Sequence, residues 1–198
     1  MPKGSTPFDR DYYQRFYFNP RTAVTTRAEA KNRARLIAAH ADYIGLPVRR
    51  ILDAGCGTGM LRAPLRRLLP RATYRGLETS EYLCKRFGWD QGLVQDYRSK
   101  QPFDLVICYD VVQYLDPATA RRALSNFARL CRGMLYFTAL TRKDWNENCD
   151  RSRTDPDVYL RTAEWYRKGL RRNFRDIGAG FWLRRGVPLT VWDLESGA

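Results

Sequence analysis

The chain alternates short apolar runs with longer segments in which apolar residues recur at helical spacing. Runs of this kind predict β-strands. The expected strands cover residues 50–53, 74–77, 93–95, 105–109 and 134–140. The clearest helical segment follows Asp116-Pro117, a favourable helix start, and carries on one face Ala120, Leu124, Phe127 and Leu130. Strands that alternate with helices predict a parallel sheet covered on both faces.

The two ends of the chain add further elements. After a helix over residues 162–173, the runs FWLRR (181–185) and LTVWDLE (189–195) flank Gly186-Val187-Pro188, and so short a turn implies an antiparallel hairpin. A helix over residues 26–44 precedes the first strand. Before it comes an aromatic cluster, either a strap on the outside or a lid over a ligand cleft: Phe8, Tyr12, Tyr13, Phe16, Tyr17 and Phe18.

These elements predict an α/β fold with a doubly wound, mostly parallel seven-stranded sheet. A C-terminal antiparallel hairpin ends the sheet, helices cover both faces, and an N-terminal helical and aromatic lid precedes it.

Composition narrows the class of protein. A chain of 198 residues with 44% hydrophobic residues suits one globular domain with a proper core. No apolar stretch reaches transmembrane length and no secretory signal pattern opens the chain, so we expect a cytoplasmic protein without a membrane partner. The five cysteines are widely spaced and His40 is the single histidine, so no metal is expected.

The net charge of +14 leaves two interpretations open. A basic protein attracts phosphates, so RNA is one candidate partner. The arginines are spread along the chain, which favours ordinary solvated faces. A helical stretch near the C-terminus does collect Arg167, Arg171, Arg172 and Arg175, which could form a basic face for RNA.

The most informative motif follows the first strand, in ILDAGCGTG. Its glycines let the backbone approach a ligand, and the helix after them offers free N–H groups at the edge where doubly wound sheets bind nucleotide-like molecules. A dinucleotide loop would carry a glycine at Met60, and Asp53 would repel its pyrophosphate. A P-loop is excluded because no GK[ST] follows. S-adenosylmethionine (SAM) has no phosphate, and its ammonium group suits Asp53.

Acids end the next two expected strands. Glu78, in YRGLE, stands where a carboxylate binds ribose hydroxyls in nucleotide-binding folds. Asp96, in LVQD, can accept a hydrogen bond from an adenine amino group. Both acids fit the adenosine part of SAM.

Together these motifs resemble those of class I SAM-dependent methyltransferases. ILDAGCGTG is similar to that family's first motif, YRGLETSEYLCKRFG to the second, LVQDY to the third and FDLVICYDVVQYLD to the fourth. With the fifth strand in CRGMLYFTAL, the resemblance covers residues 50–140. It implies in-line (SN2) methyl transfer from SAM to an oxygen or nitrogen, with S-adenosylhomocysteine (SAH) as product.

The resemblance also implies a division of labour within a single domain, 1–198. Residues 1–46 would form the lid and helix, 47–140 the cofactor-binding core, and 141–198 the acceptor side. The glycine loop would lie against the methionine part of SAM, Tyr97 near the adenine ring, and Tyr109 near the reactive methyl group. The expected cofactor-binding residues are Asp53, Gly55, Cys56, Gly57, Gly59, Glu78, Asp96, Tyr97 and Tyr109.

No residue stands out as a general base. His40 precedes the first strand and is expected to be structural. Topology places Asp110, Tyr114 and Asp144 nearer the strand ends, as weak candidates. An amine or carboxylate acceptor needs no strong base.

The acceptor is expected to be a small molecule. The fourth motif lacks the D/N-PP-Y/F signature of DNA-base amino methyltransferases and is closer to enzymes of small metabolites, a form that some tRNA-modifying enzymes share. The loop 141–161 is either the acceptor wall or a solvated loop capped by its own side chains. Arg161 could hold a carboxylate or phosphate. The candidate acceptor-binding residues are Tyr13, Tyr17, Trp145, Asn148 and Arg161. An RNA methyltransferase and a non-catalytic cofactor-binding protein remain as alternatives.

Overall fold

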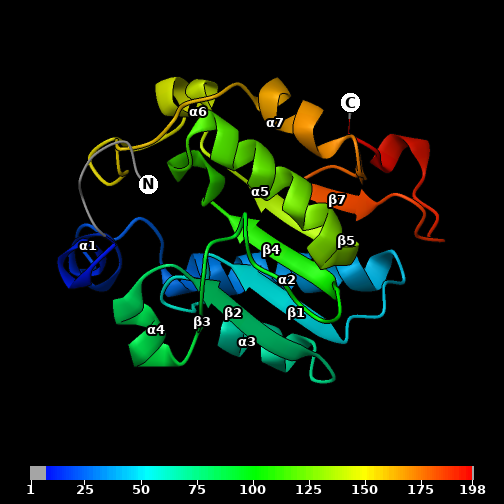
Figure 1. The fold of residues 1–198 in the computed structure, drawn as a ribbon, viewed down its shortest axis with the longest axis horizontal. Helices are drawn as coiled ribbons and strands as arrows, with labels where there is room; N and C mark the ends of the chain where they lie inside the picture. Colours follow the sequence, from blue (N-terminus) through cyan, green and yellow to red (C-terminus); the bar gives the residue numbers. More distant parts are fainter. Residues whose placement is uncertain (1–7, 198) are drawn as a thin grey trace.

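A seven-stranded sheet forms the centre of the computed structural model, which describes residues 8–197 (Figure 1). The strand order is β3-β2-β1-β4-β5-β7-β6. The strands are β1 (Arg50–Ala54), β2 (Thr73–Glu78), β3 (Asp90–Gln91), β4 (Phe103–Tyr109), β5 (Cys131–Thr138), β6 (Phe174–Asp176) and β7 (Phe181–Arg184). β1 to β5 pair in parallel, whereas β7 is antiparallel to both of its neighbours. The order reverses between β1 and β4, the position at which doubly wound sheets bind ligands.

Helices cover both faces because the central strands are apolar on both faces. In β1, Ile51 packs toward α2 (Arg27–Tyr43) and α3 (Arg62–Leu68), while Leu52 packs toward α5 (Pro117–Leu130) and α7 (Ala163–Leu170). The register pairs these two residues with Leu105 and Val106 of β4, which continue the same alternation. The predicted doubly wound architecture is thereby confirmed.

The predicted helix starts are also confirmed. Asp116 caps α5 by accepting hydrogen bonds from the N–H groups of Ala118 and Thr119, with Pro117 in the first turn. Thr26 and Glu29 form a reciprocal capping box at the start of α2. The remaining α-helices are α1 (Arg10–Tyr13), α4 (Glu81–Phe87) and α6 (Arg142–Glu147). A π-helix, Gln14–Phe18, continues α1.

The third strand lies earlier than predicted. It covers Asp90–Gln91, not residues 93–95. The N–H groups of Asp96 and Tyr97 both bond to the carbonyl of Leu93, so this stretch folds as a turn. Gly92, whose N–H bonds to the carbonyl of Glu78, begins the change of direction.

The C-terminal hairpin is present, but it uses a different pair of strands. β7 matches the predicted FWLRR run, and its partner is β6 on the N-terminal side, not residues 189–195. The reversal uses Gly178, Ala179 and Gly180, whose φ angles are 83°, 47° and 83°. Residues 189–195 lack strand pairing and end in a 3-10 helix, Asp193–Glu195.

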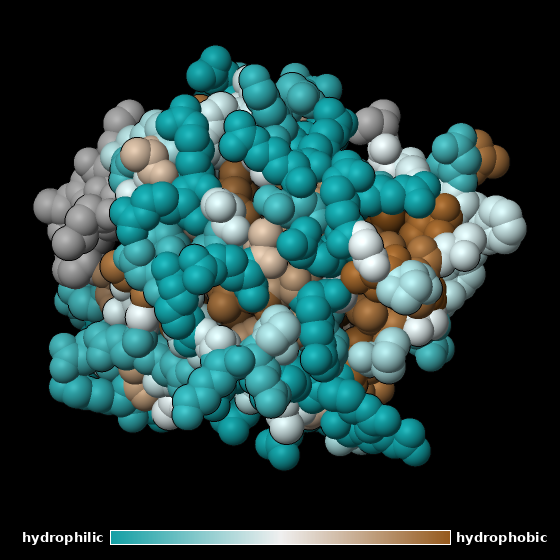
Figure 2. Space-filling view, turned by 45° about the vertical axis from the view of Figure 1, so that its right-hand side comes forward, coloured by the Kyte–Doolittle hydropathy of each residue, from teal (hydrophilic) through white to brown (hydrophobic). Residues whose placement is uncertain are grey.

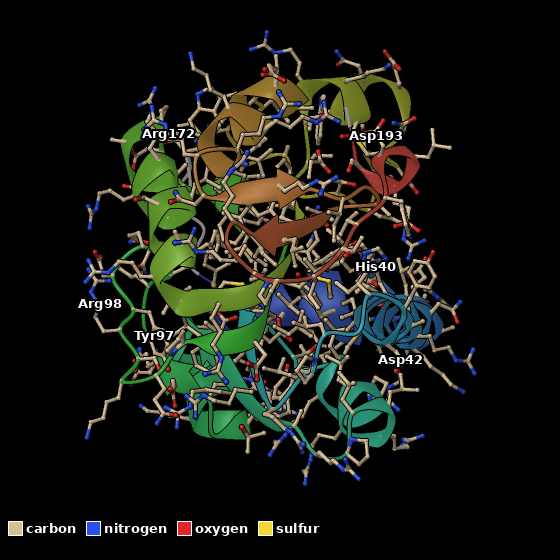
Figure 3. All side chains as sticks on the ribbon, turned by 90° about the vertical axis from the view of Figure 1, so that its right-hand side faces the viewer. His40, Asp42, Tyr97, Arg98, Arg172 and Asp193 are labelled. Carbon is tan, nitrogen blue, oxygen red and sulfur yellow. The ribbon has the colours of Figure 1, made fainter. Side chains whose placement is uncertain are left out.

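His40 packs against the antiparallel strand β7. Figure 3 shows it turned from α2 toward the C-terminal strands. Its ring stacks on Phe181, with ring centroids 4.1 Å apart. This packing agrees with the expected structural role. Within residues 8–197, no helix combines the length and apolar character needed to cross a membrane.

Candidate functional site

The glycine loop, residues 55–59, leaves β1 at the carboxyl edge of the sheet. Gly55, Gly57 and Gly59 have φ angles of 78°, 52° and 74°, a region that favours glycine. A Cβ atom at Gly55 would lie 2.3 Å from Val111, and one at Gly59 would lie 2.4 Å from the ring of Trp89. Gly57 has no such neighbour within 4 Å. The loop therefore packs at both ends and presents its middle to a cavity.

Glu78 ties this loop to β2. The side chain is buried, and its Oε2 accepts a hydrogen bond from the N–H of Gly57 at 2.8 Å. Its Oε1 accepts from the N–H groups of Thr79 at 2.8 Å and Ser80 at 3.0 Å. Three backbone donors thus fix the carboxylate in the cavity wall, and its remaining lone pairs can accept from a ligand.

Asp53 lies at the end of β1 and is buried. The hydroxyl of Tyr74 donates a hydrogen bond to its carboxylate. Burial raises the pKa of Asp53 to about 7, against the opposing effect of that hydrogen bond. Its carboxyl group therefore titrates near neutral pH in the absence of a bound cation.

Gln95 turns into the cavity that Glu78 lines. The residue is 8% exposed, and its Oε1 has no hydrogen-bond partner within the described residues. The next residue, Asp96, is exposed and forms an ion pair with Arg122 of α5. The hydroxyl of Tyr97 donates to Asp90 at 2.8 Å.

The structure therefore brings Gln95, and not Asp96 or Tyr97, to the cavity wall. The sequence analysis missed Gln95 because it took residues 93–95 as a strand and the following acid as its functional end. The turn at residues 93–97 changes which side chain points inward.

Two cavities meet at this edge and share Gly55, Gly57, Tyr109, Asp110 and Tyr114. The first is bounded by Glu78 and Gln95. The second has a volume of about 250 Å³ and extends past Asp53 toward residues 149–155. Cys56 lines this second cavity, and Tyr17 lines both.

An aromatic strap, residues 8–18, covers the first cavity. Tyr12 packs edge-on against Phe8, with ring centroids 5.0 Å apart, and its hydroxyl lies 3.2 Å from that of Tyr114. The hydroxyl of Tyr13 donates to Oε1 of Glu78 at 3.5 Å. Ser80 donates to the carbonyl of Phe8 at 2.5 Å. Of the two interpretations of the aromatic cluster, this placement over a cavity agrees with a lid.

Asp110 occupies the junction of the two cavities. Its φ angle is 55°, an uncommon conformation for a residue with a side chain. Its N–H donates to the carbonyl of Thr138 at 3.1 Å, and its Oδ1 accepts from the Thr138 hydroxyl at 3.3 Å. Burial raises the pKa of Asp110. Strained residues held in this way are concentrated at functional sites.

Arg33 is the cation of the second cavity. Its guanidinium lies 3.6 Å from the centroid of the Tyr109 ring. The sequence analysis missed Arg33 because it belongs to α2, outside the stretch that carries the motifs. No spacing rule connects it with the glycine loop.

Three other predicted site residues lie away from both cavities. Asp144 caps α6, where its carboxylate accepts from the Thr141 hydroxyl at 2.5 Å. Asn148 is exposed and donates to Asp144 at 2.9 Å. Trp145, on the same helix, lines neither cavity as the described residues form them.

Arg161 is an internal support of the fold. It is 7% exposed, and its guanidinium donates to the carbonyls of Val112 and Leu115 and to the hydroxyl of Tyr166. These contacts fix the turn after β4 to α7. With its donors directed at the protein, Arg161 is not positioned to hold an acceptor in either cavity.

Three of the four arginines considered for a basic face contact other side chains of the protein. Arg167 pairs with Asp176 at 3.9 Å, Arg171 with Glu164 at 3.4 Å, and Arg175 donates to Ser196 at 2.6 Å. Arg172 lies at the outer edge in Figure 3. Figure 2 shows hydrophilic side chains spread over the whole visible face, with hydrophobic groups between them.

Comparison with known proteins agrees with this geometry. The family model described as "Methyltransferase domain" matches residues 52–133, from β1 to the start of β5. No curated protein sequence matches the chain.

Solved structures align over most of the chain. DesVI from Streptomyces venezuelae is 16% identical, with a TM-score of 0.63, over 88% of this chain and 96% of that chain. Magnesium protoporphyrin IX methyltransferase from Synechocystis PCC 6803, with bound SAM, is 20% identical, with a TM-score of 0.60, over 88% and 90%. The N-methyltransferase NodS from Bradyrhizobium japonicum WM9, with SAH, is 16% identical, with a TM-score of 0.57, over 88% and 97%.

The methyltransferase-domain match over residues 52–133, the strand order and the glycine loop agree with the predicted class, the class I SAM-dependent methyltransferases. Similar folds have been solved with SAM or SAH bound. The cavity walls fit SAM. They offer an exposed glycine backbone, a fixed carboxylate at Glu78 and an unpartnered amide oxygen at Gln95.

Proposed function

We propose that the chain methylates a small molecule held in the second cavity. The carrying observation is that the two cavities meet at Tyr17, Asp110 and Tyr114. A donor with its adenosine in the first cavity and its methionine part beside Asp53 in the second would have its methyl group at this junction, facing the rest of the second cavity.

For the adenosine part of SAM, we assign Glu78 to the ribose hydroxyls and Gln95 to the adenine amino group. The support for Glu78 is its carboxylate, fixed against the loop by three backbone donors. The support for Gln95 is the unpartnered Oε1, because a buried acceptor gains most from a donor that arrives with the ligand.

For the methionine part, we assign Asp53 to the ammonium group and Arg33 to the carboxylate. Both residues line the second cavity, where the loop turns away from β1. Opposite charges on the two residues match the two charged ends of an amino acid. Cys56 and Gly57 form the adjoining wall.

SAM supplies a methyl group that its sulfonium has already activated, so the protein's main contribution is alignment. Asp110 is the group best placed to take a proton from an acceptor, because it stands where the cavities meet. Its raised pKa makes it a better proton acceptor than an ordinary aspartate. Tyr17 and Tyr114 would exclude water from the same junction.

A small acceptor is favoured over RNA. Similar folds carry names such as magnesium protoporphyrin IX methyltransferase and amino pentose methyltransferase. Three of the four arginines considered for RNA contact are engaged with neighbouring side chains.

Labelled methyl transfer tests the proposal. The enzyme would be incubated with methyl-labelled SAM and either bulk tRNA or the low-molecular-weight fraction of a cell extract. We expect label in the second alone, and none with a Glu78→Ala variant that no longer binds SAM. Label in tRNA would overturn the small-molecule assignment and restore the RNA alternative.

A further inference from the structure

The second cavity has the opposite charge balance to the protein as a whole. The chain carries a net charge of +14, yet the cavity walls present three carboxylates, Asp53, Asp110 and Asp155, against one guanidinium, Arg33. Within residues 8–197, none of the three acids forms an ion pair. The acidic side chains of this cavity therefore outnumber its basic ones, a balance that favours a cation over an anion.

The three acids fall into two groups. Asp53 is the next-to-last residue of β1 and Asp110 directly follows β4, so both lie at strand ends, on the donor side. Asp155 comes from the segment after α6, which lines the same cavity. In the proposed function, Asp53 binds the ammonium group of the donor and Asp110 accepts a proton. Asp155 remains for the acceptor.

Contacts fix the Asp155 carboxylate in place. The N–H of Asp157 donates to its Oδ1 at 2.9 Å. Burial, together with the charge of Asp155, raises the pKa of Tyr114, whose hydroxyl lies 3.2 Å from the hydroxyl of Tyr12. This chain of polar contacts links the strap, the turn after β4 and the acceptor-side segment.

Aromatic side chains line the same cavity as this carboxylate: Tyr17, Tyr109 and Tyr114. Faces of aromatic rings attract cations, and phenol oxygens accept hydrogen bonds from ammonium groups. A carboxylate within an aromatic wall suits an amine, whereas it would repel a carboxylate or phosphate.

We propose that the acceptor is an amine, recognised by Asp155 and the tyrosines of the same cavity. This inference rests on the proposed small-molecule function. The amine arrives as an ammonium ion and loses one proton to Asp110, which passes it to water. Its nitrogen lone pair then forms the N–C bond to the methyl carbon, while the C–S bond breaks and its electron pair stays on sulfur. The methylated nitrogen is again positive, and Asp155 stabilises that charge.

Matched probes separate charge from shape. The full-length enzyme, saturated with SAH, would be titrated by calorimetry with cyclohexylamine, cyclohexanol and cyclohexanecarboxylate, and with benzylamine, benzyl alcohol and benzoate. We expect the amine of at least one set to bind about tenfold more tightly than its alcohol, and the carboxylate to bind most weakly.

An Asp155→Asn variant tests the residue. It should lower the amine's affinity about tenfold while leaving SAH and alcohol affinities unchanged. Glu147→Gln is the matched control: it removes the same charge from the nearby helix α6, where Glu147 is exposed and faces Lys143 at 3.8 Å.

Two results would overturn the inference: no set that favours its amine, or an amine preference that Asp155→Asn reduces no more than Glu147→Gln does. The SAH titration keeps this test distinct from that of the proposed function. A protein that fails to bind SAH contradicts the cofactor site, whereas normal SAH binding without an amine preference contradicts the acceptor class alone.

Discussion

The glycine loop and the aromatic strap bound the same cavity by different physical means. The loop is held by backbone hydrogen bonds: the N–H groups of Gly55 and Cys56 bond to the carbonyl of Leu77 at 2.8 and 3.1 Å. The strap is held by ring packing, as between Tyr12 and Phe16, whose centroids are 4.9 Å apart. An added Cβ atom would clash at either end of the loop, whereas ring contacts can separate and re-form. The loop therefore sets the shape of the site, and the strap can admit and cover a ligand.

The largest expected effect comes from Gly55→Ala. The new methyl group would be in a left-handed conformation and would overlap Val111, so we expect about 3 kcal/mol less stability and no measurable SAM binding. Gly45→Ala is the control. Its φ angle is 70°, but nothing lies within 4 Å, so it should lose about 1 kcal/mol and bind SAM normally. Urea unfolding and calorimetry measure both quantities. If Gly55→Ala and Gly45→Ala show the same stability and the same SAM affinity, the loop is not rigid.

The second largest expected effect is the pH dependence that Asp53 gives to SAM affinity and to stability. Its raised pKa, about 7, favours the protonated form in the free protein, whereas a bound ammonium group favours the carboxylate. SAM affinity should therefore fall as pH drops below 7, by up to about tenfold per pH unit. In the free protein the sign is opposite: this group stabilises the fold at low pH, and that contribution is lost as pH rises through 7.

The Asp53→Asn variant tests both pH dependences. It should flatten the pH dependence of affinity and of stability together, as measured by calorimetry and urea unfolding between pH 5 and about 8. If the variant keeps the wild-type pH profile of SAM affinity, another group holds the ammonium.

A smaller effect is expected at Gln95. Gln95→Met removes the unpartnered oxygen with little change of volume, so SAM affinity should fall by about 1 kcal/mol while the free protein keeps or gains stability. Asp96→Asn breaks the ion pair with Arg122 on an exposed face and should leave SAM affinity unchanged. If Asp96→Asn lowers SAM affinity and Gln95→Met does not, Asp96 contacts the adenine amino group, as the sequence motif implies.

The smallest effect is expected in the strap. Tyr12→Phe removes the hydroxyl contact with Tyr114 but keeps the ring packing, so stability should fall by only about 0.5–1 kcal/mol. SAM should still bind. Tyr43→Phe, on α2, removes a solvent-exposed hydroxyl contact with Glu195 and is the control for loss of a hydroxyl away from the cavities. A loss of SAM binding in Tyr12→Phe would mean that polar contacts, and not rings, hold the strap.

The difference between local and distant positions in the chain explains which parts of the site could be predicted from the sequence. The glycine loop and Glu78 depend on strand ends and local spacing, and the expected positions agree with the structure. Asp96 shows the limit: β3 ends at Gln91 and not at the predicted residue 95, and the turn that follows decides which side chain faces the cavity. Arg33 and Asp155 come from α2 and from the segment after α6, and no local pattern marks them. Arg161 lies in the expected segment, but its guanidinium donates to the backbone carbonyls of Val112 and Leu115 inside the fold.

Trp89 gives the loop an optical reporter of its own. Its indole N–H donates to the carbonyl of Gly57 at 3.0 Å, and its ring lies against Gly59. Indole emission depends on the polarity and hydrogen bonding around the ring. Because the loop lines the proposed SAM site and anchors this indole, SAM binding is expected to shift the emission wavelength of Trp89.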